Sequence, residues 1–372
     1  MMRAAPADVL VVGAGVIGLF IARELLAAGA SVTVVDRGVA GGEASWAGGG
    51  ILSPLHPWRY PAAVDRLARA SQRSYPAIAA ELHEDVGIDA EWTRSGMLVL
   101  GSAEAAAARD WAARTGATLE IIRPGAAQAL QPGLEPQADP IWLPEVAQIR
   151  NPRLTAALRA DILRRGATLR EGVAVTGLRV ENDRVHGLRS GDEPLHAGQV
   201  VIAAGAWTSI LLGELAPQPP VAPVRGQMLL LRAAPGAVQR IVLHESRYLV
   251  PRRDGRVLVG STLEQAGFDK NVTPQARDDL LAAAARLLPA SRDFVLERHW
   301  AGLRPGSPQG IPLIGAHPQI AGLYLCAGHF RNGITLAPAS ARLLADLLLA
   351  RPPQLDPAPY RPRPAVREHG FT

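Results

Sequence analysis

The sequence of 372 residues contains a single cysteine, Cys326, and a single lysine, Lys270. One cysteine excludes an internal disulfide bond and any metal site that needs several thiolates. The 9 histidines show no metal-binding spacing, so no metal site is predicted. Arginine therefore supplies nearly all of the positive charge, and the arginines are spread along the chain without a basic block. The net charge of +5 thus indicates a solvated surface and argues against nucleic-acid binding.

Long apolar runs are also missing from the sequence. No run approaches the roughly 20 apolar residues that span a bilayer, so no membrane span is predicted. The N-terminal segment has no apolar stretch ahead of a cleavage site, as a secretion signal would have. With 48% hydrophobic and 20% charged residues, the composition is that of a globular protein. We expect a soluble, cytoplasmic protein that is long enough for more than one domain.

The N-terminal segment has the pattern of a dinucleotide-binding unit. An apolar strand at residues 8–12 leads into GAGVIG at residues 13–18, and a helix follows from residue 16 to about residue 28. A second strand, SVTVVD, ends at Asp36. This is the G-x-G-x-x-G fingerprint in its required context of strand, glycine turn, helix and strand. The alternative is a glycine turn that binds no ligand.

Each glycine of the fingerprint and the acidic residue after it have a physical role. Gly13 allows the tight turn, Gly15 lets the backbone approach a pyrophosphate, and Gly18 lets the helix and strand pack closely. The start of the helix offers free N–H groups and a partial positive charge to the phosphates. Asp36 stands at the end of the second strand, where a carboxylate binds ribose hydroxyls.

The fingerprint does not separate NAD from FAD, because both carry an ADP half. Residues 41–54 (GGEASWAGGGILSP) are too glycine-rich for a folded element of their own and suit a chain passing close to a bulky cofactor. The alternative is a mobile surface loop. Strand–glycine–helix pieces recur at residues 200–211 and 326–338, which indicates a discontinuous nucleotide-binding domain. A nicotinamide enzyme normally completes that domain in one block, so these features favour FAD.

The segments between these pieces have a different sequence pattern. The segments GQMLLLR, RYLVP and RVLVGS predict an antiparallel meander between residues 222 and 300, and a helix follows between Pro274 and Pro289. We predict an α/β protein with a discontinuous, Rossmann-like FAD-binding domain and an α+β substrate domain with an antiparallel sheet. The predicted boundaries are residues 1–84, 151–221 and 301–365 for the FAD-binding domain, 85–150 and 222–300 for the substrate-binding domain, and 366–372 for a tail.

The predicted cofactor-binding residues come from the fingerprint, the glycine-rich segment and the two later strand–glycine–helix pieces, with Val175 in addition. FAD is expected to bind non-covalently, because Cys326 lies inside an apolar strand and is expected to be a buried small residue and not a reactive thiol. The set comprises Gly13, Ala14, Gly15, Val16, Ile17, Gly18, Asp36, Arg37, Ser45, Trp46, Ala47, Gly48, Gly49, Gly50, Val175, Ala204, Gly205, Trp207, Gly328, His329, Phe330, Arg331, Asn332, Gly333 and Ile334.

Five segments, in this order, resemble a known family: VVGAGVIGL, ASWAGGGILSP, RYLVPRRDGRVLVGST, WAGLRPGSPQGIPLIG and AGHFRNGITLAPASARLLADL. The chain resembles the glycine oxidases of thiamine biosynthesis, within the D-amino-acid oxidase and sarcosine oxidase group, from about residue 8 to residue 350. The resemblance implies hydride transfer from glycine, sarcosine or a small D-amino acid to flavin N5. Its products would be an oxoacid, ammonia or an amine, and hydrogen peroxide, with the imine supplied to thiamine thiazole synthesis. It also implies a homotetramer.

The resemblance assigns four substrate-site residues. A substrate carboxylate calls for a fixed planar cation, and in the family the arginine of GLRPG, here Arg304, binds it. The alternative for Arg304 is a structural ion pair. Tyr248 on the RYLVP strand would reach the same carboxylate, although plain core packing is its alternative. Arg331 would lie at the flavin edge beside the substrate, and Leu263 would limit the size of the substrate side chain. At the cofactor ring we expect either His329 or Phe330 to pack.

Two other functions stay open at this point. One is an FAD-dependent glycine or D-amino-acid dehydrogenase that passes electrons to a quinone-type acceptor and not to oxygen. The other is a non-catalytic flavin- or nucleotide-binding protein, against which the GLRPG and GHFRNG motifs argue.

Overall fold

The computed structural model describes residues 7–362, except residues 102, 136–137, 192–193, 214 and 216–218. The predicted tail and the last residues of the predicted segment 301–365 lie outside the described residues.

A six-stranded sheet carries the N-terminal fingerprint. Its order is β16–β17–β10–β1–β2–β6, in which β16 is antiparallel to β17 and all other neighbours are parallel. Parallel strands covered on both faces need continuous apolar runs, and β1 is accordingly buried at every position. The strands are β1 (Val9–Val12), β2 (Val32–Val35), β6 (Thr168–Arg170), β10 (Gln199–Ile202), β16 (Leu313–Ala316) and β17 (Leu323–Ala327).

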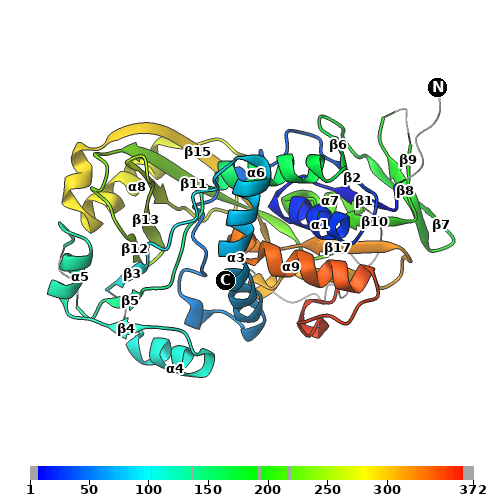
Figure 1. The fold of residues 1–372 in the computed structure, drawn as a ribbon. Helices are drawn as coiled ribbons and strands as arrows, with labels where there is room; N and C mark the ends of the chain where they lie inside the picture. The colour runs from blue at the N-terminus through cyan, green and yellow to red at the C-terminus, as the bar shows by residue number, and fades with distance from the viewer. Residues whose placement is uncertain are drawn as a thin grey trace.

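The two faces of this sheet are covered differently. Alternate residues of β1 point to opposite sides, so that Val9 and Val11 pack with helices, whereas Leu10 and Val12 pack with a small second sheet. On the helical side, α1 packs against α9 and α6, and α3 packs against the same two helices. Figure 1 shows α3 and α6 in the middle of the molecule, between the two large sheets. These helices are α1 (Val16–Ala27), α3 (Ala62–Val86), α6 (Asn151–Arg164) and α9 (Gly333–Leu348).

The small sheet on the opposite face is a three-stranded antiparallel one that sequence reasoning misses. It consists of β7 (Gly177–Glu181), β8 (Arg184–Arg189) and β9 (Leu195–His196). Figure 1 shows it at the end of the molecule farthest from the second large sheet.

An eight-stranded sheet forms the other half of the molecule, in the order β15–β11–β14–β13–β12–β3–β5–β4. The predicted meander is present, and all neighbours are antiparallel except β12 and β3. Helix α8 (Pro274–Leu287) packs on β11, β13 and β14. The strands are β3 (Met97–Leu100), β4 (Glu120–Ile121), β5 (Ile141–Leu143), β11 (Ala222–Arg232), β12 (Ile241–His244), β13 (Arg247–Pro251), β14 (Arg256–Gly260) and β15 (Val295–Gly306).

Shorter elements complete the described chain. The remaining α-helices are α2 (Ala44–Ala47), α4 (Ala105–Thr115), α5 (Pro124–Leu130) and α7 (Thr208–Leu212). The 3₁₀ helices are η1 (Pro57–Arg59), η2 (Gly205–Trp207), η3 (Pro289–Asp293), η4 (Pro308–Gly310), η5 (Phe330–Asn332) and η6 (Ala358–Tyr360). Helix α2 corrects one expectation, since the glycine-rich segment 41–54 does contain a folded element of its own.

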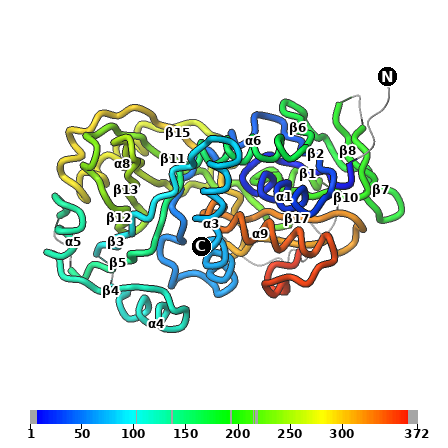
Figure 2. The backbone as a smooth tube through the Cα atoms, viewed as in Figure 1, coloured from blue at the N-terminus to red at the C-terminus, as the bar shows by residue number. Residues whose placement is uncertain are grey.

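The chain passes back and forth between the two halves. In Figure 2 the blue start, the green middle and the orange end of the chain lie in one half, whereas cyan and yellow-green segments lie in the other. Each large sheet is therefore assembled from segments that are distant in sequence. The division into two domains at the predicted boundaries stays a proposal.

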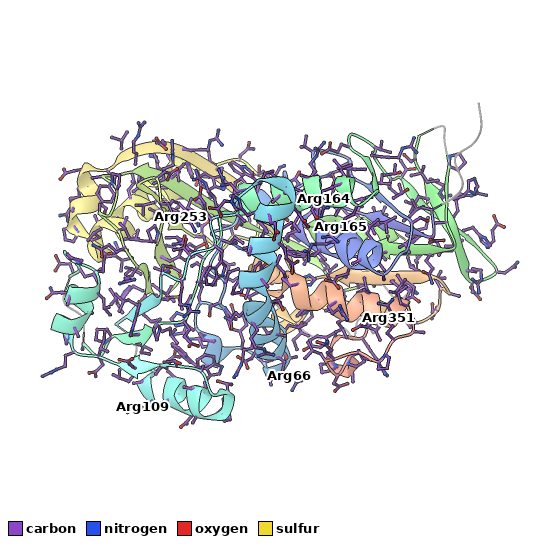
Figure 3. The ribbon with its side chains drawn as sticks, in the orientation of Figure 1. Arg66, Arg109, Arg164, Arg165, Arg253 and Arg351 are labelled. Atoms are coloured by element: carbon purple, nitrogen blue, oxygen red, sulfur yellow. The ribbon has the colours of Figure 1, made fainter. Side chains whose placement is uncertain are left out.

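Arginines are distributed over the whole molecule, as the labelled Arg66, Arg109, Arg164, Arg165, Arg253 and Arg351 in Figure 3 illustrate. Several of them are neutralised by ion pairs; Arg164 lies 2.5 Å from Asp85, for example, and Arg253 lies 2.7 Å from Asp89. Within the described part of the chain, none of the helices combines the length and the apolar character that crossing a membrane requires.

Candidate active site

A cavity of about 1150 Å³ lies where the two large sheets meet. Its wall includes the turn after β1, the turn after β17 and side chains of β11, β13 and β15. A second cavity of about 920 Å³ continues from it, because Gly15, Ser45 and Gly205 are among the residues that line both. Together they form one elongated cleft at the carboxyl ends of the parallel strands, where open α/β sheets bind their ligands.

Two glycines of the fingerprint are required by close contacts. Gly13 has φ +104°, and a Cβ there would lie 2.4 Å from the carbonyl oxygen of Ala203 at the end of β10. A Cβ on Gly18 would lie 1.9 Å from the carbonyl oxygen of Gly13. A side chain at either position would force the backbone of the turn between β1 and α1 to shift.

The turn between β1 and α1 is held by two side chains. Asp36 accepts hydrogen bonds from the N–H groups of Ala14 at 2.7 Å and of Gly38 at 2.8 Å. Ser45 Oγ accepts a hydrogen bond of 2.8 Å from the N–H of Val16, the first residue of α1. The first N–H groups of a helix have no partner inside the helix, so the start of α1 offers donors to a ligand in the cleft.

The far end of the cleft is lined by Asp36, Arg37, Val175, Ala204 and Trp207, which were all predicted to bind the cofactor. Here the guanidinium carbon of Arg37 lies 3.8 Å from the ring centre of Trp207, a cation–π contact that covers this end of the cleft.

The glycine-rich segment forms one wall of the cleft, and it is packed against other parts of the protein. A Cβ on Gly49 would lie 3.1 Å from the Tyr248 ring, and one on Gly50, at φ +72°, would lie 2.0 Å from the carbonyl oxygen of Ile149. Arg252 donates a hydrogen bond of 2.9 Å to the carbonyl oxygen of Gly49. The conformation of this segment is therefore set by its neighbours, which argues against a mobile surface loop.

Two further supports of this wall were not predicted. Asn151, the first residue of α6, donates a hydrogen bond of 3.0 Å to the carbonyl oxygen of Ser45. Arg252 is half-buried and bonded to three neutral oxygen atoms. The only sequence signal for Arg252 is its place directly after the buried strand β13, where a charged side chain needs hydrogen-bond partners.

The predicted residues Trp46 and Ala47 lie in α2. Ala47 lines the cleft, and the indole N–H of Trp300 on β15 donates a 3.1 Å hydrogen bond to its carbonyl oxygen. The Trp46 and Trp300 rings meet edge to face at 5.4 Å between centres. These contacts join the glycine-rich segment to the eight-stranded sheet.

Arg304 on β15 is a half-buried cation without a carboxylate partner among the described residues. Its Nη1 donates to the carbonyl oxygens of Arg225 at 3.2 Å and Thr262 at 3.1 Å, and its Nη2 donates to Ser261 Oγ at 2.8 Å. No carboxylate among the described residues forms an ion pair with it, so the structure does not show the alternative, a structural ion pair. Burial lowers the pKa of Arg304 to about 10, which still leaves the guanidinium charged at neutral pH.

The backbone beside Arg304 is shaped to receive its side chain. A Cβ on Gly226 of β11 would lie 2.0 Å from Arg304 Nη1. Because β11 and β15 are paired strands, this glycine leaves room for the guanidinium to lie flat across the sheet and face the cavity. Sequence reasoning missed Gly226, whose only signal is a glycine inside a strand.

Tyr248 lies close to Arg304 in the same wall. Its side chain is buried, and its ring occupies the space that a Cβ on Gly260 would need, at 2.6 Å. The nearest hydrogen-bonding atom to its hydroxyl is Met228 Sδ at 3.9 Å, which is a weak acceptor. Tyr248 therefore has a polar group available at the cavity, although its ring is part of the core.

The turn between β17 and α9 forms the opposite wall. Gly328 has φ +78° and Phe330 has φ +46°, a conformation that non-glycine residues adopt rarely. Arg331 lines the cavity and forms no ion pair with a described carboxylate. Burial is the main cause that lowers the pKa of Arg304, and the positive charge of Arg331 acts in the same direction. Asn332 at the start of α9 has a buried amide nitrogen without a partner among the described residues.

His329 and Phe330 both line the cavity. The His329 ring is buried and its Nε2 lies 3.1 Å from Ser340 Oγ, inside α9. Burial lowers the pKa of His329 to about 3, so the imidazole is neutral at working pH. It is thus a packing residue under the cavity floor and not a cation.

The structure agrees with the prediction for Cys326 and does not support that for Leu263. Cys326 is buried, and burial raises the pKa of its thiol, as expected for a small packing residue. Leu263 is 53% exposed and lies outside the residues that line the cavity, so its position lends no support to contact with a substrate.

The cleft fits FAD. At one end it offers the free donors of α1 and the Asp36 carboxylate, and at the other it offers the unpartnered Asn332 amide and the start of α9. Between the two ends lies a wall of glycines, where the backbone can approach a ligand because no Cβ atoms stand in the way. Fold and cleft together define a flavin-dependent oxidoreductase.

Comparison with known proteins agrees with this class. The family described as FAD dependent oxidoreductase (DAO) matches residues 8–347. Glycine oxidase of Pseudomonas aeruginosa is 48% identical over 356 residues, which cover 95% of this chain and 98% of that protein. The bifunctional protein ThiO/ThiG of Trichormus variabilis is 34% identical over 349 residues, or 92% of this chain and 52% of that protein.

Among solved structures, glycine oxidase from Geobacillus kaustophilus superposes with a TM-score of 0.92 at 31% identity, covering 99% of this chain and 100% of that one. The chain belongs to the DAO family of FAD-dependent oxidoreductases. The fold class, the FAD cofactor and the resemblance to glycine oxidases are thereby confirmed, and the enzyme is an FAD-dependent amine or amino-acid oxidase.

Proposed function

We propose that the enzyme oxidatively deaminates glycine and other small amines, including sarcosine and small D-amino acids. The observation that carries this proposal is the half-buried Arg304, which has no carboxylate partner among the described residues and lines the same cleft that fits FAD. A free carboxylate group on the substrate supplies the missing negative charge. The similarity to proteins named glycine oxidase supports the same substrate class.

The proposed roles follow from the donors that remain free. Arginine has five N–H groups, and the three hydrogen bonds of Arg304 leave one on Nε and one on Nη2, the pair that a bidentate carboxylate needs. The Tyr248 hydroxyl, whose present neighbour is a weak acceptor, donates to the same carboxylate. Leu263 keeps its predicted role over the substrate only if the loop after β14 closes on binding.

The protein positions the cofactor through the two ends of the cleft. The start of α1 binds the pyrophosphate, and Asp36 turns from the Ala14 N–H to a ribose hydroxyl. Arg331 and the start of α9 place positive charge at the redox ring. Bound non-covalently between these residues, FAD would supply the acceptor for the hydride of the substrate Cα, and reoxidation by oxygen would yield hydrogen peroxide.

The direct test is aerobic turnover of purified, FAD-loaded protein with glycine, sarcosine and D-alanine, measured by peroxide formation. Stoichiometric peroxide and ammonia from glycine support the proposal. A flavin that no small amine bleaches under anaerobic conditions refutes it. A flavin that glycine bleaches, but that air reoxidises slowly, identifies instead a dehydrogenase with a quinone-type acceptor.

The proposal extends to the fate of the product and to assembly. We propose that the imine supplies thiamine thiazole synthesis, which the match to the ThiO/ThiG protein supports. Growth of a thiazole-requiring strain that carries this gene and lacks its own oxidase tests that role, and failure to restore growth contradicts it. A homotetramer of the cytoplasmic enzyme is proposed from family resemblance, and light scattering measures its mass.

A further inference from the structure

A third cavity, of about 680 Å³, lies on the far side of the glycine-rich wall and is rich in arginine. Its lining includes Arg94, Arg240, Arg252 and Arg253, against a single carboxylate, that of Glu91. None of these five residues lines the FAD cleft or the cavity at Arg304. We call this space the arginine cavity.

The carboxylates around the arginine cavity are already engaged by other cations. Glu91 lies 3.1 Å from Arg150, Asp254 lies 2.9 Å from the same guanidinium, and Asp89 lies 2.7 Å from Arg253. In the described part of the chain, Arg94, Arg240 and Arg252 pair with no carboxylate. The cavity therefore carries an excess of positive charge that the protein itself does not balance.

The two inner arginines are also short of hydrogen-bond acceptors. The Nε of Arg240 is buried without a partner, and its Nη1 reaches only the carbonyl oxygen of Ser95, at 3.4 Å. Arg252 donates to neutral oxygen atoms, among them Gln148 Oε1 at 2.6 Å and Gly49 O at 2.9 Å. Burial lowers the pKa of Arg252 to about 10, and the charge of Arg150 adds to this effect, whereas the carboxylates of Glu91 and Asp254 oppose it only in part. A buried cationic donor without an acceptor is costly unless a ligand completes it.

We propose that the arginine cavity binds a phosphate group, either as free phosphate or as a phosphate monoester. Phosphate has a charge of about −1.5 to −2 at pH 7 and three or four acceptor oxygens, enough to serve several guanidinium groups at once. A single carboxylate has two oxygens and one charge, which leaves part of the excess unbalanced. The hydroxyl group of Ser95 also lines the cavity and is an additional phosphate donor, whereas that of Thr93 already donates to the carbonyl oxygen of Glu91.

The cavity is connected to the flavin site through one side chain. Arg252 lines the arginine cavity and also holds the carbonyl of Gly49, whose own backbone lies against the Tyr248 ring. A phosphate that draws on Arg252 weakens its bond to Gly49. The absorption spectrum of bound FAD is therefore a second readout of phosphate binding.

The test is isothermal titration of the FAD-loaded enzyme with inorganic phosphate at low ionic strength, since bound FAD keeps the pyrophosphate site filled. Arg240→Gln should weaken binding by about 10- to 100-fold, because it removes one charge-assisted contact. Arg109→Gln is the matched control; this exposed arginine on α4 lies away from the cavity (Figure 3) and should leave binding unchanged. Arg94→Gln, at an exposed side chain on the rim, repeats the test if Arg240→Gln does not fold.

A second titration with glycerol 3-phosphate distinguishes the two sources of phosphate. Tighter binding of the ester than of free phosphate identifies a monoester as the ligand, and equal or weaker binding identifies the free anion. The proposal is overturned by absence of binding at about 10 mM of both ligands, a concentration that would reveal any millimolar site. It is equally overturned if Arg240→Gln and Arg94→Gln bind as well as the parent, or if Arg109→Gln weakens binding as much as they do.

Discussion

Replacement of Arg304 by glutamine is the sharpest test of the substrate site. In the structure three of its hydrogen bonds go to neutral oxygen atoms, and two N–H groups are left for the substrate carboxylate. A hydrogen bond to a charged group contributes about 1.5–3 kcal/mol. Loss of the bidentate pair should therefore cost about 3–5 kcal/mol, which is about 10²–10⁴-fold in kcat/KM at 1.4 kcal/mol per factor of ten.

The change should leave the rest of the enzyme nearly intact. The variant loses three hydrogen bonds, but it also removes a half-buried cation that forms no ion pair with a described carboxylate, and these two effects oppose each other. We therefore expect the FAD absorption spectrum and the melting temperature to change little. Arg304→Lys should recover about tenfold of the lost kcat/KM, since lysine retains the charge but not the planar fork.

The assay is steady-state peroxide formation with glycine, accompanied by the FAD spectrum of each variant. The expected loss is in KM much more than in the spectrum. If Arg304→Gln keeps kcat/KM within about threefold of the parent, the carboxylate binds elsewhere and the reasoning from unpaired charge is wrong. A large loss accompanied by a changed FAD spectrum would instead show that Arg304 supports the cofactor.

Three further predictions concern the same cleft. Gly226→Ala should lower kcat/KM at least tenfold, because its Cβ would lie 2.0 Å from the Arg304 guanidinium, whereas Gly125→Ala, with open space around it, should have no effect. Arg331→Gln should lower the midpoint potential of bound FAD by about 20–40 mV, equivalent to about 1–2 kcal/mol of lost charge stabilisation, and an unchanged potential in spectroelectrochemistry would remove Arg331 from the ring. The pKa of His329 is about 3 in the folded protein against an ordinary 6.5, so the unfolded chain binds more protons between these two values. The free energy of unfolding therefore decreases by about 1.4 kcal/mol for each unit by which the pH is lowered from 6.5 toward 3. His329→Gln should flatten that fall in urea unfolding relative to the parent, and the exposed His83→Gln should not.

The fold of the contiguous unit that is proposed to bind the nucleotide was predictable from the sequence. The strand, turn, helix and second strand up to Asp36 occupy neighbouring positions in the chain, and their pattern depends on backbone rules that act locally. Gly13 was identified for the tight turn, which its positive φ shows, and Gly18 for the close packing that its surroundings show. The turn from β17 to α9 was likewise recognisable as a helix start near a ligand.

Elements that depend on tertiary packing were missed. Helix α3 contains Pro76, a residue that ordinarily ends a helix, and it persists because it packs on α6 and α9. Helix α2 forms inside a glycine-rich segment because Asn151 and Trp300 bind the carbonyl groups of Ser45 and Ala47. No local pattern contains that information.

The sequence by itself therefore determined the cofactor class, the parallel strand unit that binds it, and the arginines that stand out in their motifs. The tertiary structure decided which of those arginines lack a counter-charge. Arg304 and Arg252 lie in apolar strands or at their ends and look alike along the chain, yet one faces the cavity beside the FAD cleft and the other supports the wall from behind. The carbonyl group of Gly49, to which Arg252 donates, is 203 residues away in the chain. The glycine that leaves room for the Arg304 guanidinium, Gly226, belongs to a neighbouring strand. Charge compensation is a property of distances in space, so only the folded chain can show it.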